Sequence, residues 1–241
     1  WRRWQARPER RQPQSPPWRA FTSTAEKQAD APLVEWLTPR QTLALRQRAE
    51  ALQVSLNSLL LQALHRAVVQ TLMTHAVPIS WCFPVNMRGV VPMAKPDMNL
   101  SSAFYMTVDS DDSLTHLDHT IRRYLKANIH WRYWHLARIG RLIGQRGVDW
   151  LCGRLLNGAR HGGSFSNLGE WQMDFVSGGL APDTVFACCG PGSPTHPVAN
   201  GMIIVNGSLS LALKLHPSLG APESAVRECL QCWVEGLGVT A

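Results

Sequence analysis

Apolar residues recur at helical spacing in three stretches of the chain. Across residues 55–72 they fall three and four positions apart over a broad arc, which predicts a well-buried helix. Thr38, Pro39 and Gln41 form a capping-box pattern, which predicts that a preceding helix begins here and reaches residue 52. A third helix is predicted to open at Pro222, with an apolar face made of Val226, Leu230, Trp233 and Leu237.

The segment after Ser113 predicts one long helical region. Ser113 is a favourable N-cap, and helical spacing continues to about Trp134 and then to about Ala159. Glycines at positions 140, 144 and 147 loosen the second part, and the glycine-rich run 161–163 ends it.

Short apolar runs between these helices predict strands. Asn206-Gly207 joins the last two strands as a hairpin, because both residue types accept the positive φ of a type I′ turn. A mixed sheet flanked by helices, an α/β fold, is therefore expected. The expected strands cover 33–37, 79–85, 100–108, 163–166, 172–176, 185–189, 201–205 and 208–215.

Composition separates a basic start from a folded remainder. Proline and arginine are frequent in residues 1–32, which we expect to be a linker, and residues 33–241 have the mixture typical of a folded domain. Of the 241 residues, 45% are hydrophobic and 17% are charged, so most of the chain can bury a core. Because the chain opens on Trp1 without a signal peptide, we expect it to be a piece of a longer protein.

Positive charge is concentrated in two stretches. Residues 1–19 hold six arginines against Glu9, and residues 122–160 hold nine lysines or arginines against Asp149, while the whole chain carries +7. Such a field favours an anionic partner, either an acidic carrier protein or an anionic membrane surface, or it marks solvated faces. The sequence has no nucleic-acid-binding motif, which argues against nucleic acid as a partner. The candidate basic surface is Arg132, Arg138, Arg141 and Arg146.

The six cysteines are scattered, which predicts packed thiols in a reducing compartment. Cys229 and Cys232 form a C-x-x-C pattern, but a second ligand pair at zinc spacing is missing. We therefore expect no metal and no tightly bound cofactor. The expected location is the cytoplasm, with peripheral contact to a membrane as an alternative.

Candidate chemistry lies in the segment Ser164-Phe-Ser-Asn-Leu-Gly169. Alternation along a strand places Ser164 and Ser166 on one side and Phe165 on the other, and Asn167 then begins a turn. Hydroxyl and carboxamide groups at a strand end can donate to a developing oxyanion or hold a substrate amide. The same pattern is also typical of a turn in which an asparagine caps its own backbone.

Five segments in order resemble the C-terminal lobe of the chloramphenicol-acetyltransferase-like superfamily. This superfamily includes condensation domains of nonribosomal peptide synthetases, wax ester synthase/diacylglycerol acyltransferases and polyketide-associated acyltransferases. Together the segments span about residues 20–241. They are Val54-Ser-Leu-Asn-Ser-Leu-Leu-Leu61, Phe83-Pro-Val-Asn-Met-Arg-Gly89, Met98-Asn-Leu-Ser-Ser-Ala-Phe104, Ser164-Phe-Ser-Asn-Leu-Gly169 and Asn206-Gly-Ser-Leu-Ser-Leu-Ala212.

The resemblance implies one lobe of a two-lobed CoA-dependent-acyltransferase-like fold. An N-terminal lobe of the same protein would complete a tunnel, and residues 1–32 would be the connection between the lobes. The donor would be an acyl-CoA or a phosphopantetheinyl carrier, and the acceptor a hydroxyl or an amine. The family's H-H-x-x-x-D-G motif is missing, so no catalytic residue is expected in this chain.

The resemblance also implies roles for individual residues. Ser164, Ser166 and Asn167 would line the substrate channel, whereas Asn86, Arg88 and Asn99 would tie loops together near the lobe interface. Two other interpretations stay open: a non-catalytic relative that acts as a binding or docking module, and a basic protein that binds a membrane surface.

Overall fold

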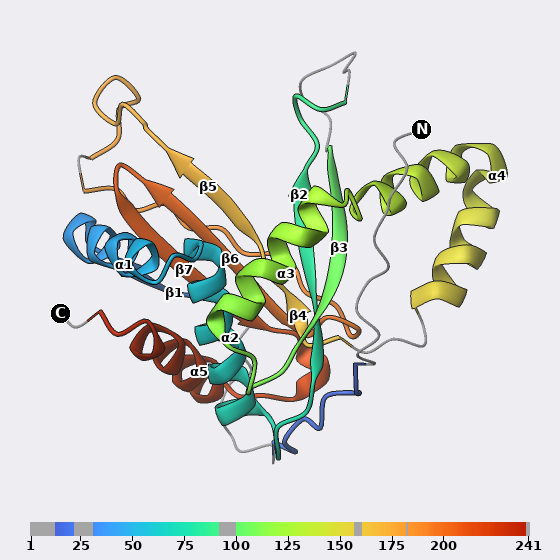
Figure 1. The fold of residues 1–241 in the computed structure, drawn as a ribbon, viewed down its shortest axis with the longest axis horizontal. Helices are drawn as coiled ribbons and strands as arrows, with labels where there is room; N and C mark the ends of the chain where they lie inside the picture. Colours follow the sequence, from blue (N-terminus) through green and yellow to red (C-terminus); the bar gives the residue numbers. More distant parts are fainter. Residues whose placement is uncertain (1–12, 22–30, 92–99, 157–160, 182, 240–241) are drawn as a thin grey trace.

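The computed structural model describes residues 13–21, 31–91, 100–156, 161–181 and 183–239, without the side chains of residues 137–139, 141 and 151–156. Its strands form one mixed sheet in the order β1-β7-β6-β4-β2-β3, and β5 pairs with β6 beside this path. The predicted α/β fold with a mixed sheet flanked by helices is therefore confirmed (Figure 1). The strands are β1 Leu33–Leu37, β2 Ile79–Asn86, β3 Ser101–Val108, β4 Gly163–Ser164, β5 Asn167–Trp171, β6 Val198–Val205 and β7 Ser208–Leu215.

Helices α2 and α5 pack against each other and cover one face of the sheet, and α3 lies beside α2 (Figure 1). Both predicted caps are present: Thr38 and Gln41 form a full capping box, and Ser113 caps α3. Ser55 caps α2 in the same way, with its side chain accepting from the amide of Ser58. The helices are α1 Pro39–Ala51, α2 Leu56–Leu72, α3 Leu114–Lys126, α4 Trp131–Leu156, the short η1 Pro217–Leu219 and α5 Glu223–Gly236.

The main core lies between α2, α5 and the sheet. Leu60, Leu64 and Trp233 are fully buried, and the indole Nε1 of Trp233 donates to the carbonyl of Leu60 at 3.0 Å. This bond links α5 to α2 across 173 positions of sequence. The apolar faces predicted for both helices therefore meet each other, which removes them from water together.

A buried carboxylate fixes the start of α2. Asp118 of α3 accepts hydrogen bonds from the backbone of Ser55 at 2.7 Å, from the hydroxyl of Ser58 at 2.9 Å and from Arg122. Burial raises the pKa of Asp118, but these hydrogen bonds outweigh burial and hold the pKa at about 2. The carboxylate therefore stays charged at neutral pH and anchors α3 to the first turn of α2.

The predicted long helix after Ser113 is interrupted. It ends at Lys126, and Asn128 adopts a positive φ of 57° before α4 begins at Trp131. Asparagine tolerates this left-handed conformation better than most residues, which explains why the break falls here. A second departure from helical geometry lies inside α4 at Gly144, where φ is 65° and ψ is 179°.

Two predicted strands were wrong. Residues 172–176 and 185–189 form turns and irregular chain, and their apolar alternation instead serves packing: Phe175 and Phe186 lie against β6. The chain does not turn away at Asn167 but continues as β5, with an irregular register and a positive φ at Gly169. Alternation cannot distinguish a paired strand from a loop that packs on a sheet.

Part of the predicted linker contacts the folded body. Within residues 13–21, Trp18 forms a bridge with Met73, and the Arg19 guanidinium donates to the carbonyls of Met73 at 3.0 Å and Gln70 at 2.8 Å. These contacts place the segment along the C-terminal end of α2. The rest of the first 30 residues, apart from this segment, lies outside the described part of the chain.

Candidate functional site

The sheet divides at the segment Gly163–Asn167, which we call the fork. At Gly163 and Ser164 the chain lies between β2 and β6, and the amide of Phe165 still donates to Cys82 of β2 at 2.7 Å. From Asn167 onward β5 pairs with β6. Within the described strands, β2 beyond Cys82 pairs with β3 alone. The fork therefore lies where the two wings of the sheet separate.

Side chains alternate across the fork as predicted. Phe165 is buried and packs against Phe83, with ring centroids 5.3 Å apart, on the helix-covered face. Ser164 and Ser166 are half-buried. Neither serine hydroxyl has a hydrogen-bond partner among the residues that the structure describes, so both can donate to a bound group.

A buried carboxamide that the sequence analysis missed holds the fork in place. Asn200 of β6 is completely buried; its Oδ1 accepts from the amide of Ser166 at 3.2 Å, and its Nδ2 donates to the carbonyl of Ser164. These two bonds satisfy backbone groups of the fork that lose their partners in the sheet where the strands separate. The sequence signal that could have revealed it is a single asparagine within β6, whose other residues are apolar or small.

Asn167 connects the fork to α2. Its Nδ2 donates to Oδ1 of Asn57 at 2.6 Å, and its Oδ1 accepts from the amide of Gly169 at 2.7 Å. The second bond is the self-capping arrangement typical of an asparagine turn. Both ends of the carboxamide are thus used within the chain, while its predicted place in a substrate channel stays a prediction.

The residues predicted to tie loops together lie at the other end of β2. Oδ1 of Asn86 accepts from the amide of Arg88 at 2.9 Å, and Arg88 forms a backbone bridge with Val91. This arrangement ends β2 and starts the following loop. Asn99 lies outside the described residues.

An aromatic and imidazole group lies next to the fork, and we call it the tyrosine–histidine cluster: Tyr105, Tyr133, His161 and His196. The rings of His161 and His196 stack with centroids 4.6 Å apart, and His161 lies 4.4 Å from the Tyr105 ring. The Tyr105 hydroxyl and Nε2 of His196 are 3.1 Å apart. Cys82 pairs with both Tyr105 and Ser164, so the cluster and the fork share one face of the sheet, opposite α2 and α5.

Burial keeps this cluster uncharged. Burial, and then the neighbouring His196, lower the pKa of His161 to about 4, and burial also lowers the pKa of His196. Burial raises the pKa of Tyr105 and of Cys82. Tyr105, the neighbouring Cys82 and both imidazoles are therefore neutral at pH 7, and Nδ1 of His161 is buried without a partner in the described structure. Neutral groups of this kind can orient a polar substrate by hydrogen bonds.

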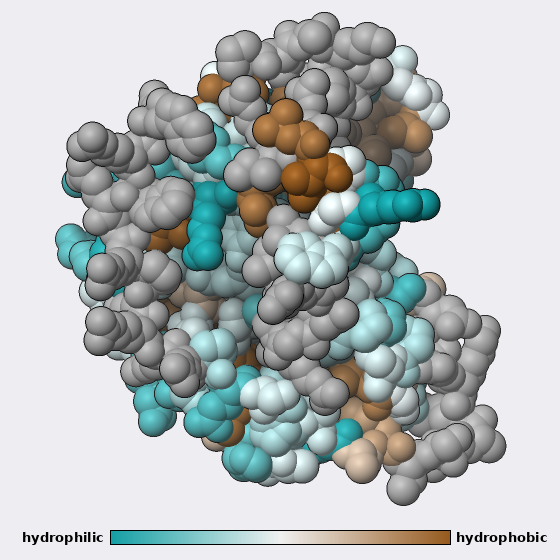
Figure 2. All heavy atoms as spheres, turned by 90° about the vertical axis from the view of Figure 1, so that its right-hand side faces the viewer, coloured by the Kyte–Doolittle hydropathy of each residue, from teal (hydrophilic) through white to brown (hydrophobic). Residues whose placement is uncertain are grey.

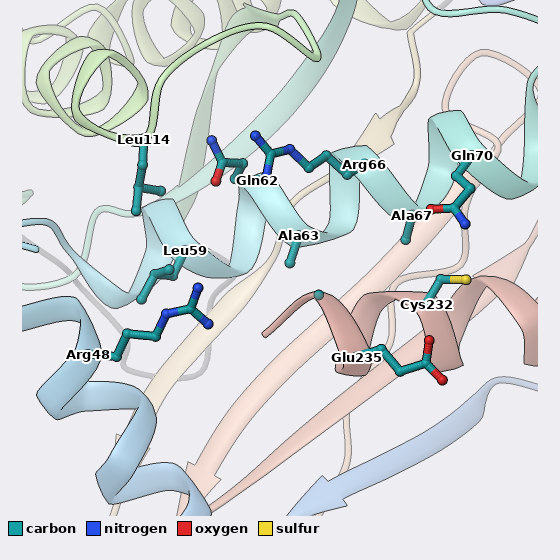
Figure 3. Close-up of a pocket in the computed structure, with 11 residues that line it drawn as sticks. Arg48, Leu59, Gln62, Ala63, Arg66, Ala67, Gln70, Leu114, Cys232 and Glu235 are labelled. Carbon is teal, nitrogen blue, oxygen red and sulfur yellow. The ribbon is translucent and has the colours of Figure 1, made fainter. Parts of the chain in front are cut away.

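A separate pocket of about 280 Å³ lies on the helix side, mainly between α2 and α5 (Figure 3). Its lining mixes apolar residues such as Leu59 and Ala63 with the charged residues Arg48, Arg66 and Glu235. Arg48 donates to the carbonyl of Leu237 and thereby ties α1 to the end of α5. None of the residues predicted to carry chemistry lines this pocket, so we place the candidate site at the fork.

The remaining predicted residues belong to α4, where the side chains of Arg132 and Arg146 are exposed. The side chains of Arg138 and Arg141 lie outside the described part. Five cysteines in the described chain are free thiols, as predicted, and no three metal-ligating side chains gather there. No described helix has the length and apolar character needed to cross a membrane.

Comparison with known proteins gives the fold but no close relative. No protein-family model and no curated sequence matches the chain. Among solved structures, the epimerization domain from the third module of tyrocidine synthetase B is similar with a TM-score of 0.62 and 18% identity, covering 95% of this chain and 52% of that one.

Two further similar structures are a cyclization-docking bidomain and an acetyltransferase. The EpoB cyclization-docking bidomain from Sorangium cellulosum is similar with a TM-score of 0.55 and 16% identity, covering 93% of this chain and 45% of that one. Trichothecene 15-O-acetyltransferase from Fusarium sporotrichioides is similar with a TM-score of 0.51 and 12% identity, covering 86% of this chain and 46% of that one. The chain thus has the fold of condensation domains and related chloramphenicol-acetyltransferase-like acyltransferases, as its sequence predicted. It spans about half the length of these structures.

Proposed function

We propose that the chain is one lobe of an enzyme that transfers an acyl group from a CoA or carrier thioester to a hydroxyl or amine. The observation that carries this proposal is the fork, where two half-buried serine hydroxyls lack partners in the described structure. In the reaction, the acceptor attacks the thioester carbonyl, the C–S bond breaks, and the sulfur leaves as the thiol. The fold alone does not determine which reaction is catalysed, because the similar structures include epimerization and cyclization domains.

In this proposal the lobe forms a wall of the substrate channel and does not supply the base. Neutral imidazole must accept the acceptor's proton, but a pKa near 4 makes His161 a weak base at neutral pH. The hydroxyls of Ser164 and Ser166 instead donate to the thioester oxygen or to the acceptor. The base would come from a second lobe of the same protein.

The surface beside the fork supports a second lobe. Leu168 and Trp171 on β5 are about half exposed, and Val176 in the following turn is 76% exposed. A neighbouring run of exposed large apolar side chains is typical of an interface that another surface covers. We infer that the second lobe covers this side of β5.

The 241-residue chain alone is expected to transfer no acyl group from acetyl-CoA or from an acyl-pantetheine thioester to an alcohol or amine. The reason is that the described histidines of the cluster have no carboxylate partner and a low pKa. The measurement is thiol release together with product detection by mass spectrometry. Activity that disappears in a His161→Gln or His196→Gln variant would show that the base lies in this chain.

In the complete two-lobed protein, Ser166→Ala is expected to lower kcat about tenfold or more through loss of a donor at the reacting centre. The thermal midpoint should stay nearly constant, since the hydroxyl has no partner in the described fold. Ser208→Ala, another half-buried serine on β7, is the matched control and should leave both quantities unchanged. Unchanged turnover in the Ser166 variant would favour the alternative of a non-catalytic docking module.

A further inference from the structure

Helix α4 forms an arm at one side of the molecule and packs mainly against β3 (Figure 1). It bends sharply at Gly144, and two other glycines make the bend tight. A Cβ on Gly147 would lie 2.7 Å from Cβ of Ile143, and one on Gly140 would lie 3.0 Å from Cγ2 of Val148. The three glycines therefore allow the two halves of α4 to approach each other. We call residues 140–150 the bend.

The bend presents large apolar side chains to solvent. Leu142 is 86% exposed, Trp150 is 63% exposed and Ile143 is also exposed. Figure 2 looks onto the side of the molecule that carries α4 and shows apolar side chains exposed close to strongly hydrophilic ones. Such residues are costly to leave in water as a group and mark a surface that contacts something apolar.

The same helix is strongly basic. Residues 131–156 contain five arginines and a single acidic residue, Asp149. The Asp149 carboxylate accepts from Nε2 of Gln145 at 2.8 Å, while Arg146 beside it is exposed. The partner must therefore combine an apolar layer with negative charge.

We propose that the bend of α4 binds the surface of an anionic lipid bilayer. Leu142 and Ile143 enter the boundary between head groups and acyl chains, and Trp150 lies at the level of the head groups. The exposed side chain of Arg146 remains at the lipid phosphates, with its aliphatic stem along the apolar boundary. A nucleic-acid backbone would satisfy the charge but leave the exposed aliphatic side chains in water.

The test is co-sedimentation of the 241-residue chain with vesicles of phosphatidylglycerol and phosphatidylcholine in equal parts, and with pure phosphatidylcholine vesicles. Binding is expected for the anionic vesicles at low salt and should weaken at high salt. Leu142→Gln and Arg146→Glu should each weaken binding about fivefold to tenfold. Their matched controls are Leu43→Gln and Arg40→Glu on α1, where both residues are exposed; these should bind as the parent chain does.

Circular dichroism should be unchanged in all four variants, because each altered side chain is exposed. The proposal is overturned if the parent chain does not bind anionic vesicles at low salt. It is also overturned if the two vesicle types bind equally, or if the α1 controls weaken binding as much as the α4 variants. If Leu142→Gln and Arg146→Glu bind vesicles as the parent chain does but no longer bind a separately produced second lobe, the proposal is also overturned. The bend would then belong to the lobe interface.

Discussion

Gly163→Ala is expected to lower the free energy of unfolding by about 3 kcal/mol or more, or to prevent folding. A Cβ at this position would lie 2.0 Å from the carbonyl oxygen of Val198, which is backbone of β6 and cannot rotate away. Since Gly163 pairs with β2 on one side and β6 on the other, relief of the clash requires the two wings of the sheet to separate. Urea denaturation followed by circular dichroism measures the effect.

Gly190→Ala is the matched control for this substitution. The nearest atom to a Cβ at Gly190 is Oγ of Ser164 at 4.0 Å, which is ordinary contact distance. The control variant should therefore unfold within about 1 kcal/mol of the parent chain. Equal stability of both variants and the parent would mean that β4 is not held between β2 and β6 as described.

Acidification from pH 6.5 to pH 4 is expected to remove about 3 kcal/mol of stability through His65 alone. This imidazole is buried in α2; Nε1 of Trp81 donates to its Nδ1 at 3.2 Å, and the Ser110 hydroxyl lies 3.4 Å from its Nε2. Burial lowers the pKa of His65 to about 4, against smaller opposing effects from nearby carboxylates. His161, whose pKa is also about 4, adds to the loss.

The sign follows from the proton balance. Between pH 6.5 and pH 4 the unfolded chain binds a proton at His65, whereas the folded chain leaves this imidazole neutral. Stability is therefore complete above pH 6.5 and falls as the pH decreases toward 4. Asp118 acts at lower pH, because its pKa of about 2 means that its contribution is lost only below its ordinary pKa of 3.8.

Urea midpoints across this pH range test the prediction. His65→Gln should flatten the dependence on pH, because an amide does not titrate. His75→Gln, at an exposed position after α2, should leave the dependence unchanged. A parent chain that is equally stable at pH 6.5 and pH 4 would contradict the description of His65 as a buried neutral group.

Local patterns in the sequence were sufficient for the helices of the core. Thr38 and Ser113 cap helices as predicted, because each side chain bonds to an amide only three positions away. The Asn206-Gly207 turn also formed between β6 and β7, since asparagine and glycine both accept the positive φ that the turn requires. The alternation of Ser164, Phe165 and Ser166 was predictable for the same reason.

The arrangement around the candidate site depends on contacts between segments far apart in sequence. Asn200 meets the fork across more than 30 positions, and Asn57 meets Asn167 across 110. Tyr105 and His196 lie 91 positions apart, so no local pattern indicated that they form one neutral cluster. The sequence by itself determined the caps, the buried helix faces, the final hairpin and the resemblance to acyltransferase lobes, because these depend on neighbouring residues. Only the tertiary structure decided where the sheet divides, which carboxamide holds the fork and which imidazoles lose their charge, because burial and long-range hydrogen bonds exist only once the strands are assembled.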